Sequence, residues 1–179
     1  MLRRTLLAVA LLSSSLALAQ PPDIPKVTRV RRPVVTLETS KGSIQIILYP
    51  DITPKTVENF LTLVKKGFYN GLTFHRVDPG YVVQGGDPKG NGSGGPGYTI
   101  PNEKSAPLRH NRGAVAMANS GRDTAGSQFY IVLNKPAPNL DEKDADGVNK
   151  YTVFGQVIVG QKVAESLKVG DKITKATVK

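Results

Sequence analysis

Hydrophobic and polar residues alternate along residues 34–49, VVTLETSKGSIQIILY. Alternation of this kind is typical of an extended strand with one buried and one solvated face. The pattern repeats after the turn SKGS, so the segment predicts a β-hairpin whose two strands bury the same face. The apolar positions of that face are Val35, Leu37, Ile44, Ile46 and Leu48.

The pattern becomes helical in residues 51–68, DITPKTVENFLTLVKKGF. Val57, Phe60, Leu61 and Val64 fall at the spacing i, i+3, i+4 and i+7, which places them on one face of a helix. Thr53 is suited to cap this helix and Pro54 to occupy its first position, and Gly67 suits the residue after its end.

Further strands are predicted at residues 113–118, 128–133 and 151–157, and a last strand at 172–178. A short helix fits residues 160–168, where Val163, Ala164 and Leu167 share a face. In the strand 128–133, alternation puts Phe129, Ile131 and Leu133 on the core face and Gln128 and Tyr130 on the other.

A second hairpin is predicted at residues 74–87, FHRVDPGYVVQGGD, with Arg76 and Gln84 inside its apolar runs. Alternation places Arg76 on the same face as Phe74, two residues earlier. A glycine-rich loop follows at residues 85–97, and such loops are usually either functional or disordered. If these strands meet the strand 128–133, they form a groove lined by apolar and aromatic side chains, with fixed polar donors. Such a groove suits an extended peptide with an apolar residue better than a phosphate or a sugar.

The N-terminal segment differs from the rest of the chain. Residues 1–19 combine a basic start, a short apolar run and the small-residue pattern ALA at 17–19, which predicts a cleaved secretory signal peptide. An uncleaved membrane anchor is the alternative. Residues 20–33 are rich in proline and basic residues and predict an extended tether, unless a first strand begins near Val27. Residues 34–179 then form one domain.

Composition narrows the class of protein. The chain contains 18 Gly and 13 Pro, which favours many turns and short strands. It has no Cys, so an exported domain must be stable without disulfides. The net charge is +10, and loss of Arg3 and Arg4 with the signal leaves 10 − 2 = +8. Because the basic residues are scattered, we expect a solvated basic surface and no nucleic-acid partner.

Several motifs do not carry their usual function. Gly90–Gly95 matches G-x-G-x-x-G but is followed by Pro-Gly rather than by a helix. Glu142–Gly147 resembles the start of a calcium loop, but the twelfth position is Val153 and the bidentate Glu is missing. Ser127 lacks the G-x-S-x-G context of a hydrolase nucleophile.

The chain has only two histidines, which makes a protein zinc site improbable. His75 lies between Phe74 and Arg76 in an apolar segment, and we expect it to be a hydrogen-bonded structural residue. His110, in LRHNRG, has basic neighbours and no obvious acid nearby.

Four blocks together resemble the cyclophilin family of peptidyl-prolyl isomerases: FHRVDPGYVVQGGD, GNGSGG, GAVAMANSGRDTAGSQFYI and YTVFGQVIVG. The resemblance runs from about Val34 to the C-terminus. It implies a mainly β fold, a closed eight-stranded antiparallel β-barrel capped by two α-helices. It also implies isomerisation of Xaa-Pro peptide bonds without a metal or other cofactor.

The resemblance assigns roles to individual residues. The implied catalytic residues are Arg76, Gln84, Asn119 and Gln128, with Asn119 holding the substrate backbone. The implied substrate-binding residues are Tyr81, Val82, Gly92, Ala118, Ser120, Tyr130, Leu140 and Tyr151. Some positions depart from the family pattern: Tyr81 and Tyr130 stand where Phe is usual, Val82 where Met is usual, Asn139 where many members have Trp or Phe, and Tyr151 where many have His.

The expected function is therefore isomerisation of proline-containing polypeptides during the folding of exported proteins, in the periplasm or after secretion. We expect a monomer with no stable membrane insertion once the signal is removed. A non-catalytic peptide-binding or chaperone module on the same fold is the alternative, and turnover separates the two. A scaffold tethered to the membrane by an uncleaved leader is a third hypothesis.

Overall fold

The computed structural model describes residues 31–134 and 136–179. The predicted signal peptide and residues 20–30 of the predicted tether lie outside the described residues. Within the described residues, no helix combines the length and the apolar character needed to cross a membrane.

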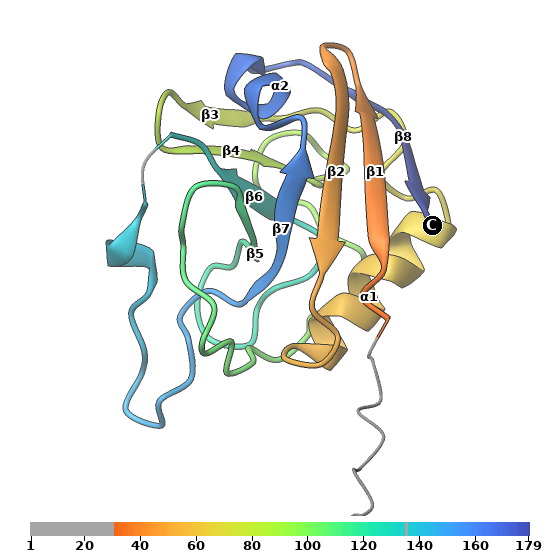
Figure 1. Cartoon of the computed structure of the whole chain (residues 1–179). Coiled ribbons are helices and arrows are strands. Elements are labelled where there is room, and N and C mark those ends of the chain that lie inside the picture. The colour runs from red at the N-terminus through yellow and green to blue at the C-terminus, as the bar shows by residue number, and fades with distance from the viewer. Residues whose placement is uncertain (1–30, 135) are drawn as a thin grey trace, which may run out of the picture.

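The described chain is built mainly from β-strands, with two α-helices (Figure 1). The elements in chain order are β1 (Val34–Thr39), β2 (Gly42–Leu48), α1 (Pro54–Lys65), β3 (Arg76–Asp78), β4 (Val82–Gly85), β5 (Ala114–Met117), β6 (Phe129–Val132), the 3-10 turn η1 (Pro138–Leu140), β7 (Val153–Val159), α2 (Gln161–Ser166) and β8 (Ile173–Val178). Every strand and helix that periodicity predicted is present, with bounds shifted by one or two residues.

The strands form a single eight-stranded antiparallel sheet in the order β3-β4-β6-β5-β7-β2-β1-β8. The sheet curls, so that β3 and β4 run across the direction of β1 and β2 (Figure 1). The predicted closed barrel is wrong, because the edge strands β3 and β8 do not pair and the sheet is open. The segment just before β3 does meet the start of β8. Thr73 and Lys172 form an isolated bridge, and backbone hydrogen bonds join residues 71–74 to residues 170–173. β3 itself is only three residues long and pairs with β4 alone.

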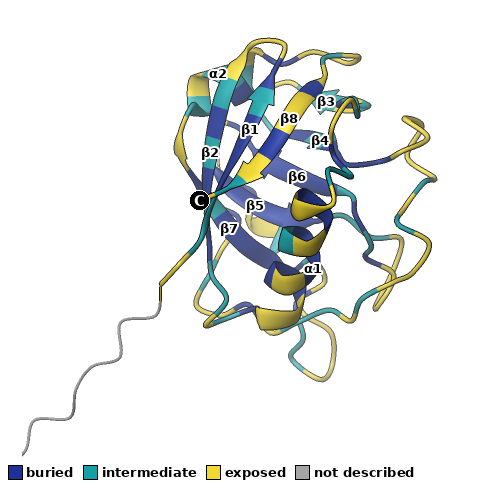
Figure 2. Ribbon diagram, turned by 90° about the vertical axis from the view of Figure 1, so that its right-hand side faces the viewer, coloured by how far each residue is buried: buried dark blue, intermediate teal, exposed yellow. Residues whose placement is uncertain are grey.

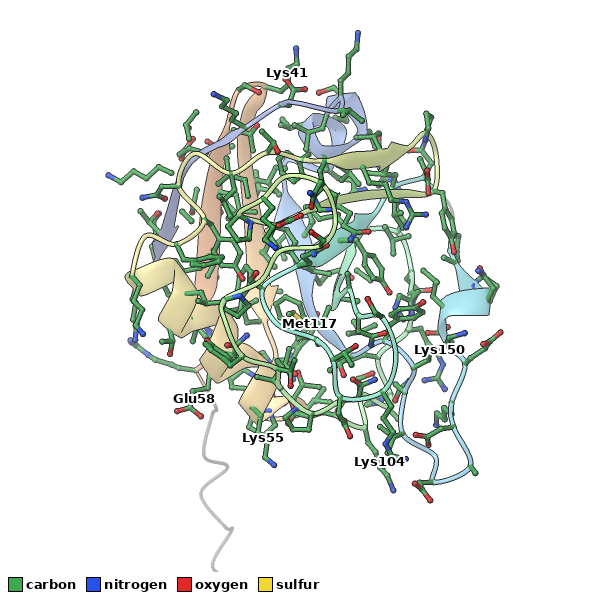
Figure 3. All side chains as sticks on the ribbon, turned by 180° about the vertical axis from the view of Figure 1, so that it is seen from behind. Lys41, Lys55, Glu58, Lys104, Met117 and Lys150 are labelled. Carbon is green, nitrogen blue, oxygen red and sulfur yellow. The ribbon has the colours of Figure 1, made fainter. Side chains whose placement is uncertain are left out.

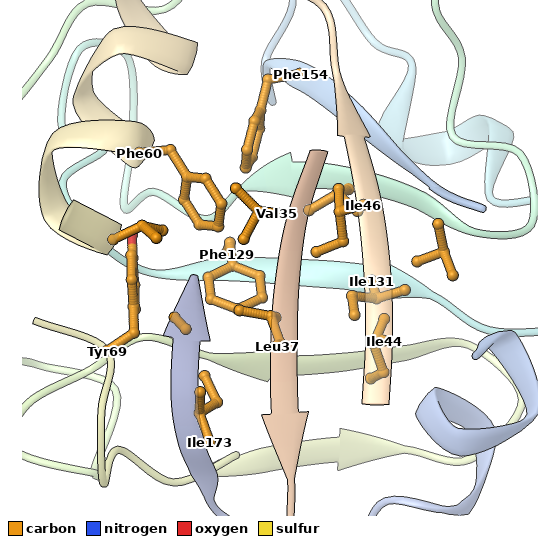
Figure 4. Packing of buried hydrophobic residues seen from close by; sticks show 14 of the residues in the cluster. Val35, Leu37, Ile44, Ile46, Phe60, Tyr69, Phe129, Ile131, Phe154 and Ile173 are labelled. Atoms are coloured by element: carbon orange, nitrogen blue, oxygen red, sulfur yellow. The ribbon is translucent and has the colours of Figure 1, made fainter. Parts of the chain in front are cut away.

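The main core fills the inside of the curled sheet. All five predicted apolar positions of the first hairpin are 0% exposed, and Leu37 lies opposite Ile44 in the β1–β2 register. An aromatic cluster completes this core (Figure 4). The Phe60 ring of α1 lies 5.5 Å from Phe129 and 5.0 Å from Phe154, measured between ring centroids. The period-2 pattern of the hairpin was therefore a correct guide to the buried face.

Helix α1 lies against the core with one face buried and the other exposed (Figure 2). Val57, Phe60 and Val64 are buried as predicted, whereas Leu61 is only partly buried and Leu63 takes its place in the core. Gly67 follows the helix with φ +69°, a conformation that favours glycine.

Thr53 occupies the N-cap position of α1 and Pro54 its first turn, as predicted, but the Thr53 side chain makes no capping hydrogen bond. The carboxylate of Glu103 accepts hydrogen bonds from the backbone N–H of Lys55 at 3.2 Å and of Thr56 at 2.8 Å. A carboxylate is a stronger acceptor than a hydroxyl, and a negative charge is favourable at a helix N-terminus.

Strands β5 and β6 are buried on both faces. As predicted, Phe129, Ile131 and Leu133 join the main core. Tyr130 points the other way into a second apolar cluster. The buried members of this cluster are Val82, Ala114, Ala116, Tyr130, Val132, Ala137 and Val153. The second cluster supports the surface on which most of the predicted site residues lie.

Basic side chains are spread over the surface rather than gathered on one face. Figure 3 shows Lys41 at one end of the molecule, Lys55 and Lys104 at the other and Lys150 at the side, all pointing outward. Met117, by contrast, lies in the interior.

Candidate functional site

Strand register alone brings three predicted site residues into one row. Arg76 of β3 lies opposite Gln84 of β4, and Gln84 lies opposite Tyr130 of β6. Residues directly opposite each other on antiparallel strands project from the same face of the sheet. That face is the one carrying the second cluster, so Arg76 and Gln84 are polar at positions that border a surface cavity rather than the main core.

The prediction that Arg76 and Phe74 lie on the same face is wrong. Phe74 is 0% exposed in the main core, whereas Arg76 is exposed on the opposite surface. Alternation does not apply between them, because β3 begins only at Arg76 and the chain before it bridges to Lys172 through Thr73.

Two adjoining cavities contain the predicted site. The smaller cavity, of about 240 Å³, is lined by Arg76, Tyr81, Val82, Gln84, Ala118, Asn119, Tyr130, Leu140 and Tyr151. The larger cavity, of about 460 Å³, shares Gln84, Ala118 and Asn119 with it and adds Gly92, Ser120 and Gln128 as well as the loop Ser93–Thr99. Every residue that the sequence assigned to catalysis or binding thus borders one of the two cavities, although their roles stay predictions.

A chain of hydrogen bonds runs along the border of the cavities. Arg76 Nη1 lies 3.5 Å from Gln84 Oε1, and Gln84 Nε2 donates to Gln128 Oε1 at 2.9 Å. Gln128 Nε2 in turn donates to the carbonyl oxygens of Gly92 at 2.9 Å and Gly94 at 2.8 Å. The two glutamines are therefore held in fixed orientations.

The glycine-rich loop is organised by Asp87, which is 1% exposed. Its carboxylate accepts backbone hydrogen bonds from Lys89 at 2.7 Å, Asn91 at 3.0 Å and Gly92 at 2.6 Å. Burial alone would raise the pKa of Asp87, but these N–H donors hold it below its ordinary value. Gly94 has no room for a side chain, because a Cβ would collide with the Asp87 carboxylate.

Arg76 has a partner that sequence reasoning missed. Its Nη2 lies 2.5 Å from Asp78 Oδ2, and both side chains remain accessible, at 53% and 41% exposed. Two residues apart on a strand, they project from the same face, so the i, i+2 spacing could have indicated this pair. Asp78 holds one side of the guanidinium and leaves other N–H groups free to donate.

The wall of the smaller cavity is aromatic and aliphatic. The rings of Tyr130 and Tyr151 meet edge to face, with centroids 6.0 Å apart. The Tyr81 hydroxyl accepts a hydrogen bond from Asn139 Nδ2 at 2.8 Å. Asn119 Nδ2 donates to the Lys150 carbonyl at 2.8 Å. The result is a hollow with aromatic and aliphatic side chains in its wall, the amides of Gln84 and Asn119 beside them and a charged donor at its rim. Such a hollow can hold a small ring and a peptide backbone.

The expectation that His75 is hydrogen-bonded is wrong, and His110 has a partner that its sequence neighbours did not indicate. Neither ring nitrogen of His75 has a hydrogen-bond partner in the described part of the chain, although both are buried. His110 does have an acid partner, since its Nδ1 lies 2.8 Å from Asp141 Oδ1. Asp141 is 31 residues further along the chain, so no local spacing could have indicated it.

Metal ligands do not gather in the described residues 31–134 and 136–179, where no group of three or more His, Cys, Asp or Glu side chains could hold an ion.

Comparison with protein families gives one match over most of the chain. The family described as cyclophilin type peptidyl-prolyl cis-trans isomerase/CLD matches residues 34–179. The chain is 49% identical over 138 residues to peptidyl-prolyl cis-trans isomerase B of Bacillus subtilis strain 168, covering 76% of this chain and 91% of the relative. It is 43% identical over 157 residues to a peptidyl-prolyl cis-trans isomerase of Helicobacter pylori strain J99, covering 87% and 90%.

Solved structures show the same fold. A crystal structure of a Cryptosporidium parvum cyclophilin type peptidyl-prolyl cis-trans isomerase matches with a TM-score of 0.71 and 29% identity, covering 83% of this chain and 97% of the other. A crystal structure of the same protein in the presence of the dipeptide Ala-Pro matches with a TM-score of 0.70 and 28% identity, covering 82% and 98%.

Proposed function

The chain belongs to the family of cyclophilin-type peptidyl-prolyl cis-trans isomerases, and from this premise we propose that it accelerates rotation about Xaa-Pro peptide bonds in the smaller cavity. The observation that carries the proposal is the accessible guanidinium of Arg76 at the rim of a hollow of about 240 Å³ that has aromatic and aliphatic side chains in its wall. The solved relative crystallised in the presence of Ala-Pro supports a proline-containing peptide as the substrate.

The reaction requires that the peptide C–N bond lose its double-bond character. Rotation about a peptide bond meets a barrier of about 18–20 kcal/mol, and X-Pro bonds exchange over tens to hundreds of seconds without a catalyst. A donor aimed at the proline nitrogen draws its lone pair out of conjugation and lowers that barrier. Arg76 suits this role because its guanidinium is always charged and its donors are fixed in a planar fork.

The size of this effect can be estimated. A hydrogen bond from a charged donor contributes about 1.5–3 kcal/mol, which corresponds to roughly one to two powers of ten in rate. A larger acceleration requires the rest of the site to be preorganised for the twisted peptide. The hydrogen bonds of Gln84 and Gln128 support such preorganisation, because they already hold both amides in fixed orientations.

The remaining residues hold the substrate on either side of the bond. Val82, Tyr130 and Leu140 offer an apolar surface for the proline ring. Asn119 borders both cavities, so it is placed to hydrogen-bond the substrate backbone as the chain passes between them. The ring is thus held while the preceding carbonyl turns.

We further propose that the enzyme acts as a monomer on exported proteins. The leader pattern at residues 1–19 supports export. Sequencing the N-terminus of the protein recovered from cell fractions tests this. A new N-terminus at Gln20 in an extracytoplasmic fraction is expected, and an intact leader in the membrane fraction would contradict it. Light scattering of the purified protein should give the mass of a single chain, and a larger mass would contradict the monomer.

The activity itself is tested by exchange NMR on an Xaa-Pro peptide with the wild-type protein. Catalysis predicts faster cis–trans exchange at substoichiometric enzyme, with the equilibrium isomer ratio unchanged. Binding without faster exchange would instead support a non-catalytic peptide-binding module.

A further inference from the structure

A hydrogen-bonded chain of three side chains ends at the wall of the smaller cavity. Asp141 Oδ1 lies 2.8 Å from His110 Nδ1, and His110 Nε2 lies 2.8 Å from the Tyr130 hydroxyl. Asp141 Oδ1 also accepts the His110 backbone N–H at 3.0 Å. The side chain of His110 is 0% exposed, and that of Asp141 is 21% exposed. None of the site roles assigned so far uses His110 or Asp141.

The chemistry of the three groups determines which atom donates and which accepts in each of these hydrogen bonds. Burial lowers the pKa of His110, although the Asp141 carboxylate opposes this, so the imidazole is neutral at pH 7. A neutral imidazole has one donor and one acceptor nitrogen. Since the carboxylate can only accept, Nδ1 carries the hydrogen and Nε2 accepts the hydroxyl hydrogen of Tyr130. Burial also raises the pKa of Tyr130, which keeps its hydroxyl protonated and able to donate.

The hydrogen bond from the Tyr130 hydroxyl to His110 fixes how the Tyr130 ring is oriented at the cavity. The ring of Tyr130 is nearly parallel to that of His110, at 18° with centroids 5.8 Å apart, while its other contact with Tyr151 is edge to face. A hydroxyl left without a partner in an apolar site costs free energy and attracts water. Because the hydroxyl is bound on the side away from the cavity, Tyr130 presents an apolar ring to the substrate.

We propose that His110 and Asp141 are positioning residues which hold the ring of Tyr130 in the smaller cavity through its hydroxyl, and so set the affinity of the site for the proline ring. The inference rests on the proposed function, because it assigns this cavity to proline. His110 and Asp141 do not touch the substrate, and their effect passes entirely through Tyr130.

Steady-state kinetics on an Xaa-Pro peptide test this with two substitutions at His110. In His110→Asn the amide nitrogen stands near the former Nδ1 and can still bind Asp141, but the side chain does not reach Tyr130. In His110→Gln the longer side chain can accept from the Tyr130 hydroxyl. Losing one hydrogen bond predicts that His110→Asn raises KM about fivefold. The substitution should leave kcat within about twofold, because the ring is held equally before and during rotation. His110→Gln should recover most of the lost affinity.

The same substitutions are then made in Tyr130→Phe, whose own KM serves as the reference. With no hydroxyl to hold, His110→Asn should change KM by less than about twofold. An equal rise in KM in both backgrounds would overturn the proposal, since His110 would then act through packing. An unchanged KM for His110→Asn in the wild-type background would overturn it as well. If His110→Asn does not fold, Asp141→Ala takes its place with the same two expectations.

The tautomer of His110 can be measured independently of catalytic activity. The ¹⁵N shifts of the His110 ring in the wild-type protein should show hydrogen on Nδ1 and an unprotonated Nε2, and the opposite tautomer would contradict the chain. The two proposals also fail differently. An inactive wild type with the Nδ1–H tautomer refutes the proposed function, whereas an active wild type with equal effects in both backgrounds refutes only the role of His110.

Discussion

At the scale of single residues, two neighbours hold the guanidinium of Arg76. Asp78 binds it on one side, and Gln84 lies on the facing strand. Both Arg76 and Asp78 are well exposed, and exposed ion pairs contribute little to stability. Asp78 therefore orients the arginine more than it stabilises the fold.

Replacing Asp78 by Ala should consequently have a small effect. The guanidinium keeps its charge but loses one fixed direction, so we expect kcat/KM to fall by less than about fivefold. The free energy of unfolding should change by less than about 0.5 kcal/mol. Exchange NMR and urea unfolding measure the two quantities, and a loss of activity as large as that of Arg76→Ala would show that Asp78 does more than orient its neighbour.

The places of the site residues at the cavities were predictable where contiguous motifs carried them. Arg76, Gln84 and Gln128 lie in such motifs, and each borders a cavity. The partnership of His110 with Asp141 could not be predicted, because it joins two loops that only the folded chain brings together.

At the scale of elements, β6 separates the two apolar clusters. Phe129 faces the main core, where its ring lies 5.5 Å from Phe60 and 5.6 Å from Tyr69. Tyr130 faces the second cluster and the open cavity. Truncating the Phe129 side chain leaves a closed void, whereas water can enter the space left when the Tyr130 side chain is truncated.

Phe129→Ala should therefore lower the free energy of unfolding by about 3–5 kcal/mol. Tyr130→Ala should lower it less but weaken binding of a proline peptide. Urea unfolding and a peptide titration of both variants separate the effects. Equal destabilisation by the two substitutions would contradict the claim that Phe129 faces the main core and Tyr130 the open cavity.

The N-terminus of α1 depends on a residue from a distant loop. Glu103→Ala removes the acceptor for two backbone N–H groups and should lower the free energy of unfolding by about 0.5–2 kcal/mol. Glu58→Ala, on the exposed face of the same helix, is the control and should change it by less than about 0.5 kcal/mol. If the two substitutions cost the same, Glu103 is not the cap.

Strands and helices whose hydrophobic residues repeat at a regular spacing were predictable. How these elements pair with one another was not. The hairpin β1–β2 and helix α1 follow from spacing within a few residues. Whether β3 pairs with β8 depends on residues almost a hundred positions apart, and no local pattern reports that. The cap at Glu103 was missed for the same reason, because the loop that supplies it is remote in sequence.

At the scale of the whole molecule, we expect the two histidines to make stability depend on pH. Burial lowers the pKa of His110 in the folded protein, while the unfolded chain has the ordinary value of about 6.5. Below that pH the unfolded chain binds more protons than the folded one, so the free energy of unfolding falls as the pH falls. Above it both states are neutral at this residue and the contribution disappears.

We therefore expect the wild type to lose stability as the pH is lowered from about 7.5 to about 5.5. His110→Asn should lose less over the same interval, because its residue 110 does not titrate. Burial also lowers the pKa of His75, which leaves a residual slope in the variant. Urea unfolding at several pH values measures this, and identical slopes would show that His110 is not held neutral.

The central claim is that Arg76 drives rotation of the Xaa-Pro bond, and exchange NMR on one peptide with three proteins tests it most directly. Arg112 is the matched control, because its side chain is 48% exposed, close to the 53% of Arg76, and pairs with Glu165 away from the cavities. With all three proteins folded, Arg76→Ala should lose roughly one to two powers of ten in exchange rate. Arg112→Ala should match the wild type. Full activity in Arg76→Ala, or an equal loss in both variants, would contradict the claim.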